Sequence, residues 1–600
     1  MEKIVEEALT GEKFIKKSLI LQNYENTNNF LCDFLDYIYK RTNDRTSFND
    51  IELINITRYV EKYNEYNEEV YDKMKLISDR AQELNKSANS NDQKKLKKIS
   101  SFFQELLSAC GYDTSKSQLE RVELGHVIDK IIFENHEIGI FDVINQSDKI
   151  HKYRYKDGEL LVNKVLRYLK DSLSKDFLES ANYYSRLIFE LSKKDPYKID
   201  TICNELREYK KTINDKEKSK IILSLIDKLA IIKTTTLTKE EKETTLKRLK
   251  HNFDIHNDFS KEIETIETLT HSRKNSLVDL RHRKIITIDQ KYKTAFDDAI
   301  SIEKTKDGYI LSIYITDVDS FIDTKSILYK HAKERGESIY GDKKNTFYIP
   351  MFPLDITRDM FSLNKQQDKY VVVHDFYFSD TFDLIKFKFY NGIININNNY
   401  TFDSIEHIKN NDTNYDMIYM LLKMSEELSY IKNKQYHKYK EKNKQHSTEN
   451  SIGSNIIETS TIFLNSYIAN YCSQANYPLI YKVHEPFECK DNIRGKEAQN
   501  LIRRCNTIQY STIPKGHPVN NNKPYAQMTN PIRSYASLVN QHIFSYLFLD
   551  LNRIEDIIAF KKYWRDNLPY VVEDLNKRLE KNKEFLSVIQ ELDSKRLTKK

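Results

Sequence analysis

Thr287-Ile288-Asp289 and Phe296-Asp297-Asp298-Ala299-Ile300 form the most informative stretch of this 600-residue chain. The apolar residues at 285–288 and 299–302 predict two β-strands joined by a loop. That loop would bring Asp289, Asp297 and Asp298 towards one point. Hard carboxylate oxygens gathered in this way suit Mg²⁺, with Mn²⁺ as a substitute. Solvated aspartates at a turn give the same pattern, so this stretch alone leaves both interpretations open.

Four further motifs follow the acidic loop in a fixed order. They read Arg335-Gly336-Glu337-Ser338-Ile339-Tyr340, Pro350-Met351-Phe352-Pro353, Ser362-Leu363-Asn364 and Thr529-Asn530-Pro531-Ile532-Arg533. In this order and at these separations, the chain resembles the catalytic domain of the ribonuclease II-type (RNB) exoribonucleases, over residues 277–549. The resemblance implies hydrolysis of single-stranded RNA from its 3′ end to nucleoside 5′-monophosphates, by two-metal-ion catalysis.

The resemblance also implies the residues that perform this chemistry. Asp289, Asp297 and Asp298 correspond to metal ligands or groups that position water, and Asp297 and Asp298 count as catalytic. Arg533 corresponds to an arginine that contacts phosphate beside the metals and stabilises the transition state. A surface ion pair is the alternative for any isolated arginine.

Three more residues correspond to positions that contact RNA in the family. Tyr340 matches an aromatic residue that stacks on bases, and Phe402 lies near a family tyrosine that clamps the last nucleotide. A role in the hydrophobic core is the alternative for Phe402. Glu458 lies at or next to a family glutamate near the scissile end, and Thr459 is the alternative for that position.

The chain departs from the family pattern at several positions. Ala295 stands where the family has a fourth acidic residue, and this change weakens the expected metal site. Around Arg533, the residues that differ from the family are Asn530, Ser534, Ser537, Gln541 and His542. A second hypothesis is therefore an RNB-fold protein with weakened catalysis that serves as an RNA-binding or scaffold subunit of an RNA-processing complex. A third is a helical interaction protein whose motif matches are accidental.

Composition narrows the class of protein. The formal net charge is only +6, so a polyanion site must be local and not spread over the whole surface. No apolar run reaches the ~18 residues of a membrane span, so we expect no membrane partner. The six cysteines are scattered without a Cys-x-x-Cys pair, which argues against a zinc module. We expect reduced packing cysteines and a cytoplasmic or other reducing compartment.

The pattern predicts an α+β protein in three parts. Residues 1–275 form a mainly helical region with a possible small β element at 122–143. This region would capture RNA or dock a protein partner, or its helices only shield the catalytic domain. Residues 276–549 form the RNB-like domain, a mixed sheet with helices. Residues 550–600 form a charged tail of short helices. Glycines are few in the first half, so the OB-fold barrels that usually accompany RNB domains are not expected.

The RNB-like region has its own local predictions. Residues 310–318 and 371–378 alternate as strands. The Asn391-Gly392 pair within 387–394 predicts a hairpin with a type I′ turn. Helices dominate after residue 415, and the polar stretch 432–454 is expected to be a mobile surface loop.

Overall fold

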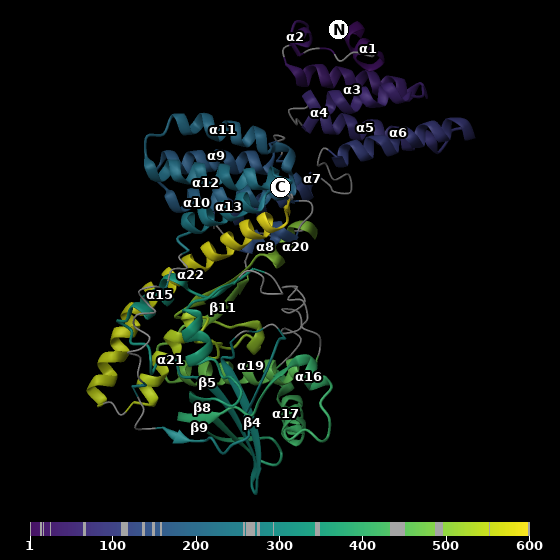
Figure 1. Ribbon diagram of the computed structural model, residues 1–600. Helices are drawn as coiled ribbons and strands as arrows, with labels where there is room; N and C mark the ends of the chain where they lie inside the picture. Colours follow the sequence, from purple (N-terminus) through teal and green to yellow (C-terminus); the bar gives the residue numbers. More distant parts are fainter. Residues whose placement is uncertain are drawn as a thin grey trace. The chain divides into compact units, whose positions relative to one another are not determined.

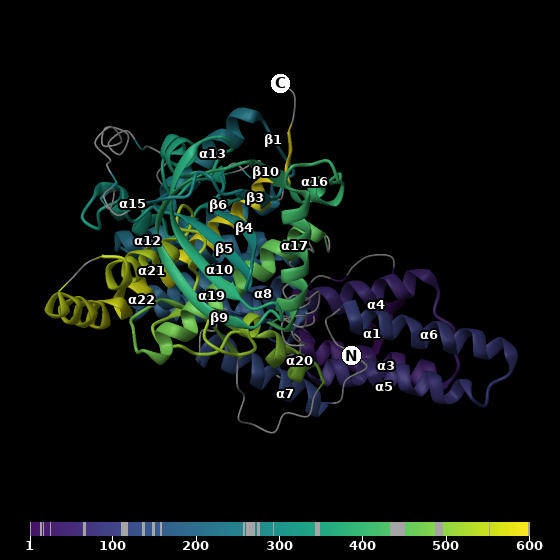
Figure 2. The same ribbon diagram turned by 90° about the horizontal axis from the view of Figure 1, so that it is seen from below.

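The computed structural model of this chain contains two compact units (Figures 1 and 2). One consists of residues 1–235 and 486–506, and the other of residues 236–485 and 507–600. The structure describes all residues except 1, 12–14, 16, 25, 64–67, 110–117, 135–138, 147–149, 156–158, 256–258, 260–270, 273–276, 292, 294, 342–347, 432–450, 487–495, 551–552 and 598–600.

The first unit is helical, as the sequence predicts. Its amphipathic helices place residues such as Phe30, Phe34 and Tyr59 in a core where their rings contact one another. Helix α12 begins after Asp215, whose side chain caps it by accepting from the Lys218 backbone N–H. The helices are α1 (Glu2–Thr10), α2 (Lys17–Ile20), α3 (Thr27–Asn43), α4 (Asp50–Tyr63), α5 (Glu68–Asn85), α6 (Ser90–Ala109), α7 (Gln118–Asp129), α8 (Gly139–Gln146), α9 (Leu161–Ser174), α10 (Leu178–Lys194), α11 (Ile199–Lys211), α12 (Lys216–Lys233) and α20 (Lys496–Arg504).

The predicted small β element at 122–143 is wrong. Its described residues form α7, a π-helical turn at Lys130–Glu134 and the start of α8. The buried residues Val127, Ile128, Ile131 and Ile132 recur at the three- and four-residue steps of a helix face. This helical spacing outweighs the β propensity of the individual valines and isoleucines.

The second unit is built on a seven-stranded mixed sheet with the order β10-β3-β4-β5-β8-β9-β2. The inner pairs are antiparallel, whereas β10 pairs with β3 and β2 with β9 in parallel. This mixed sheet with helices confirms the predicted α+β class. The strands are β2 (Val278–Asp279), β3 (Ile286–Asp289), β4 (Asp298–Thr305), β5 (Gly308–Thr316), β8 (Asp368–Phe378), β9 (Leu384–Asn395) and β10 (Asn398–Thr401). Outside this sheet, two-stranded pairs are formed by β1 (Thr236–Leu237) with β13 (Arg596–Leu597), β6 (Ile339–Tyr340) with β7 (Tyr348–Ile349), and β11 (Tyr481–Pro486) with β12 (Asn506–Ser511).

Both faces of the sheet are buried. Ile313 and Ile315 on β5 belong to the large core shared with the helices, whereas Tyr314 between them belongs to a smaller core on the opposite face. The period-two alternation of a strand produces this division. The helices of this unit are α13 (Lys239–Asn252), α15 (Ile327–Arg335), α16 (Phe402–Glu406), α17 (Tyr415–Glu427), α19 (Ile452–Gln474), α21 (Tyr535–Phe548) and α22 (Ile554–Asp593).

The hairpin predicted at 387–394 is wrong. Strand β9 runs without interruption through Asn391 and Gly392, which pair with Val372 and Val371 of β8. A Cβ on Gly392 would lie 3.0 Å from a Val373 methyl and 3.2 Å from a Leu280 methyl. The glycine therefore permits close packing and forms no turn.

Two other local predictions concern the later part of the chain. The C-terminal segments form one 40-residue helix, α22, which continues past Pro569, and not several short helices. Most of the predicted loop at 432–454 lies outside the described residues, but Ser451 already caps α19 by accepting from the Ser454 backbone N–H.

Two general features bear on the expectations from composition. Within the described part of the chain, no helix has the length and apolar character needed to cross a membrane. The four cysteines among the described residues, Cys32, Cys203, Cys472 and Cys505, are buried free thiols, as expected for packing residues.

Burial of His374 leads to a pH-dependent stability. Its ring lies between Phe387 and Phe544 in the core, and burial lowers its pKa from 6.5 to about 4. The folded state therefore holds the imidazole neutral where the unfolded chain protonates it. The stability from this effect is complete above pH 6.5 and is lost as the pH falls towards 4.

We expect the His374→Phe variant to lose less stability than the native chain on acidification. Between pH 7.5 and pH 4.5 the difference in unfolding free energy should change by about 2–3 kcal/mol in favour of the variant. Urea titrations at the two pH values measure it. Parallel losses in the two proteins would contradict the assigned environment of His374.

Candidate active site

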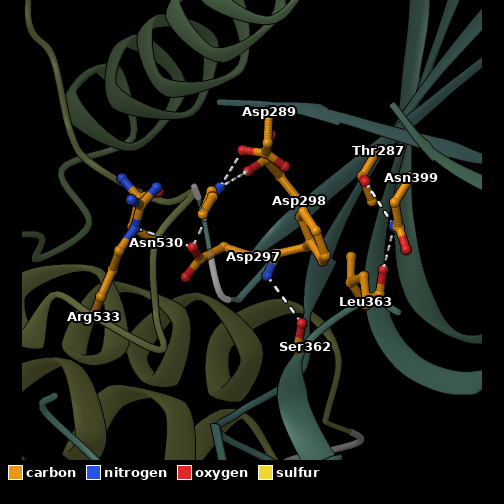
Figure 3. A network of polar contacts seen from close by, with 11 residues as sticks. Thr287, Asp289, Asp297, Asp298, Ser362, Leu363, Asn399, Asn530 and Arg533 are labelled. Atoms are coloured by element: carbon orange, nitrogen blue, oxygen red, sulfur yellow. Dashed lines mark hydrogen bonds and ion pairs between the residues drawn. The ribbon is translucent and has the colours of Figure 1, made fainter. Parts of the chain in front are cut away.

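Three aspartates meet where β3 and β4 adjoin. Asp289 is the last residue of β3, Asp298 is the first of β4, and Asp297 precedes it (Figure 3). The backbone N–H of Phe296 donates to Ser362 Oγ at 3.0 Å, and the Phe296 carbonyl accepts from the Leu363 N–H at 3.0 Å. The Ser-Leu-Asn motif thus fixes the end of the acidic loop.

Lys293, which no motif in the sequence marks, lies among these carboxylates. Its ammonium forms an ion pair with Asp289 Oδ1 and lies 3.8 Å from Asp297 Oδ2 and 4.0 Å from Asp298 Oδ1. All four side chains are at most 15% exposed. The acidic cluster is therefore arranged around a cation from its own loop.

Arg533 reaches the same cluster from the other end of the RNB-like region. Its Nε lies 3.0 Å from Asp297 Oδ2, and its Nη2 donates to Asn530 Oδ1 at 2.7 Å. Figure 3 shows the Arg533 guanidinium beside the Asp297 carboxylate. Asn530, one of the departures from the family pattern, thus holds one arm of the guanidinium.

The Arg-Gly-x-Ser segment positions the backbone of Arg533. The Ser338 N–H donates to the Arg533 carbonyl, and the Tyr535 N–H donates to the Gly336 carbonyl, both at 2.9 Å. Gly336 has φ of +76°, a conformation that favours glycine and ends α15 at this point. Two motifs that are distant in sequence are therefore joined through their backbones.

Gln541 and His542, two further departures, support the site from α21. Gln541 Oε1 accepts from the Val318 and Asp319 N–H groups at 3.1 Å, and its Nε2 donates to the Thr316 carbonyl at 2.9 Å. His542 Nδ1 lies 2.7 Å from Asp319 Oδ1. The N–H of Thr316, the last residue of β5, donates to the Asp297 carbonyl at 3.0 Å. The acidic loop and α21 therefore both contact the end of β5.

A polar pocket of about 350 Å³ adjoins Arg533. Its lining includes Tyr340, Gln527, Asn530 and Arg533. Tyr340 is 37% exposed and stacks on Tyr348, with ring centroids 4.9 Å apart. The structure thus brings Tyr340 and Arg533 together on one pocket.

Phe402 and Glu458 belong to two helices, α16 and α19, that contact β3. The β10–β3 register places Thr401 opposite Asp289, so Phe402 is one residue beyond that pair, at the start of α16. Phe402 is only partly buried, although it packs against the main core. Glu458 is partly exposed on α19, whereas its alternative Thr459 is fully buried.

The carboxylates outnumber the cations in this cluster. Burial raises the pKa of Asp298 to about 6, and the negative charges of Asp289 and Asp297 act in the same direction. The positive charges of Lys293 and Arg533 oppose this rise but do not cancel it. Burial alone would lower the pKa of Lys293, but the carboxylates, Asp289 foremost, raise it above its ordinary value. The cluster therefore favours further positive charge, as a proton or a cation.

The donor atoms fit a hard divalent cation, but their present placement does not form a binding set. Asp289 Oδ2 and Asp297 Oδ1 are buried without a hydrogen-bond partner, which is costly unless a cation satisfies them. Yet no group of three acidic, histidine or cysteine side chains within the described ranges is placed to hold an ion. The ammonium of Lys293 accounts for the difference, because it occupies the centre of the three carboxylates.

Comparison with known proteins identifies the class of this sheet-based unit. Residues 277–498 match the RNB domain family. These residues therefore form a divergent RNB domain, as the motifs predict, and the chain is similar to ribonuclease R proteins.

Individual relatives show how far the similarity extends. Ribonuclease R of Mycoplasmopsis pulmonis is 31% identical over 229 residues, which cover 36% of this chain and 31% of that protein. Ribonuclease R of Vibrio parahaemolyticus is 27% identical over 343 residues, or 47% and 40% of the two chains. This chain thus spans less than half the length of these relatives. A solved structure of Mycoplasma genitalium RNase R in complex with ribose-methylated single-stranded RNA superimposes with a TM-score of 0.48 at 16% identity, over 58% of this chain and 63% of that one.

Proposed function

We propose that this chain is an exoribonuclease that hydrolyses single-stranded RNA from the 3′ end, in the presence of Mg²⁺, and releases nucleoside 5′-monophosphates. The observation that supports this proposal most is the meeting of Arg533 with the three aspartates, 3.0 Å from Asp297. An arginine fork beside carboxylates with unsatisfied oxygens is an arrangement for holding a phosphodiester next to a bound cation.

Asp289, Asp297 and Asp298 would hold the divalent cation. A bound ion of this kind lowers the pKa of a coordinated water and neutralises charge on the leaving oxygen. Arg533 would orient the scissile phosphate and stabilise the negative charge that develops on its oxygens. Its guanidinium remains protonated, because the neighbouring carboxylates raise its pKa although burial alone would lower it.

Other residues would hold the RNA without reading its sequence. Tyr340 is exposed at the pocket beside Arg533 and is available to stack on a base, at about 1–3 kcal/mol per stacked base. Phe402, next to the residue paired with Asp289, would contact the terminal nucleotide, and Glu458 would line the approach. We further propose that the protein acts in a reducing compartment and that its helical first unit docks a partner protein.

The direct test uses a 5′-labelled oligoribonucleotide with purified protein and Mg²⁺. We expect a ladder that shortens to a small 5′-labelled end product, with nucleoside 5′-monophosphates released from the other end, and complete loss of cleavage with EDTA. Tight RNA binding without shortening would favour the weakened, RNA-binding alternative, for which Ala295 and the central Lys293 are the specific observations. A protein that neither binds nor cleaves the RNA would contradict both the proposed function and the RNA-binding alternative.

The Ala295→Asp variant tests the missing acidic residue. A fourth carboxylate next to the cluster should lower the Mg²⁺ concentration needed for half-maximal cleavage by about 10–100-fold. Cleavage rates measured over a series of Mg²⁺ concentrations check this. An unchanged Mg²⁺ dependence would mean that residue 295 does not limit the site.

A further inference from the structure

The acidic loop supplies its own cation to the centre of the site. Lys293 lies four residues after Asp289 and four before Asp297, in the loop that joins β3 to β4. Its ammonium approaches an oxygen of each of the three aspartates, at distances up to 4.0 Å. Arg533, the other cation of the cluster, contacts Asp297 from the side of Asn530. The lysine therefore occupies the position at which the carboxylates converge.

The charge balance of the cluster changes with this lysine. Three carboxylates against Lys293 and Arg533 leave one net negative charge, so one divalent ion brings the cluster to a net charge of +1. A site with a fourth acid at position 295 and Arg533 as its only cation would have a net charge of −3. Two divalent ions would bring that net charge to the same +1. Alanine in place of an acid at position 295 and the added Lys293 together make the net charge of the cluster more positive by two. One divalent ion would contribute the same charge.

We propose that the Lys293 ammonium takes the place of one of the two divalent cations and that this site binds a single divalent ion. This inference rests on the proposed function, because it assigns the cation requirement of that same site. An ammonium is a compact point charge that neutralises neighbouring oxygens, but it has no coordination position for water. Lys293 therefore replaces the charge of an ion and not its bound water.

The position of Lys293 also sets how tightly the remaining ion binds. The ammonium is only 15% exposed, so water and salt screen it less than they screen a surface lysine. Any ion held by Asp289, Asp297 and Asp298 must share their oxygens with it. The affinity for a divalent ion is then lower than three buried carboxylates alone would give.

Binding of Mn²⁺ to the full chain, without RNA, tests the proposal. Electron paramagnetic resonance of free Mn²⁺ gives the number of ions bound and their affinity. We expect one Mn²⁺ per native chain. The Lys293→Met variant should bind a second ion, or bind the first at least about tenfold more tightly, because a nearby positive charge is removed. Lys293→Arg, which keeps the charge, should behave like the native chain.

The matched control is Lys291→Met, which removes an exposed lysine of the same loop and should leave Mn²⁺ binding unchanged. Lys293→Gln repeats the test if the Met variant does not fold, as judged by circular dichroism. Two ions on the native chain, or one ion with unchanged affinity after loss of the Lys293 charge, would overturn the proposal. The RNA cleavage assay is separate: a change in Mn²⁺ binding without any cleavage would contradict the proposed function and leave the role of Lys293 intact.

Discussion

The Asp298→Asn variant should cleave RNA more than about 100-fold more slowly than the native chain. Loss of a carboxylate proposed to hold the metal should exceed the 10–100-fold cost of losing an outer partner. The change is isosteric and removes one negative charge from the cluster around Lys293. Asp298 makes no ion pair with Arg533, so the arginine should stay in place against Asp297. RNA affinity, measured by fluorescence anisotropy, should then change by less than about threefold, well under 1 kcal/mol.

The control for this variant is Asp307→Asn. Asp307 is an exposed residue at the turn between β4 and β5, at the opposite end of the strand that begins with Asp298. The Asp307→Asn variant should cleave RNA at the native rate. Cleavage by Asp298→Asn at the native rate would remove the acidic cluster from the mechanism.

The Arg533→Ala variant should slow cleavage by roughly 100–1000-fold, the usual cost of removing a group that stabilises transition-state charge. RNA binding should weaken by less than about tenfold, because the aromatic contacts remain. Single-turnover rates and anisotropy titrations separate the two effects. Equal losses in rate and affinity would contradict the role proposed for Arg533.

Two companion variants make this result interpretable. Removing Arg533 takes the nearer of two cations from the buried Asp297 and leaves only Lys293 at 3.8 Å, which can cost up to about 3–5 kcal/mol of stability. Arg533→Lys keeps a positive charge but loses the planar fork, so it should fold well and recover only part of the rate. Arg553→Ala, at an exposed arginine paired with Asp556, should have no effect on cleavage.

Much of the fold follows from local patterns. The two strands around the acidic loop appear where their apolar residues predict them, and the described part of the first 235 residues is mainly helical, as expected. The errors arise where a local signal has a second physical cause. Asn391-Gly392 resembles a turn, but the glycine serves the close approach of Val373 and Leu280. The tail predicted as short helices forms the single helix α22, which continues through Pro569.

The site is predictable only in part, for a different reason. Ordered motifs are enough to select the aspartates and Arg533, because those residues have a distinctive order along the chain. Lys293 has no such signal, since a lysine in a polar loop is ordinary and only the folded loop places it among the carboxylates. The contributions of Asn530 and Gln541 are likewise visible only as contacts, with Arg533 and with the end of β5.

The joining of distant segments affects when this centre forms during protein synthesis. The end of β5 that contacts the acidic loop is also held by α21, for example between Val318 and Gln541, which are 223 positions apart. Chains fold from the N-terminus as they leave the ribosome, so the aspartates emerge long before their guanidinium. A nascent chain released before Arg533 would hold the acids without their arginine. Under the proposed function, fragments translated from a broken message are therefore expected to leave RNA uncleaved.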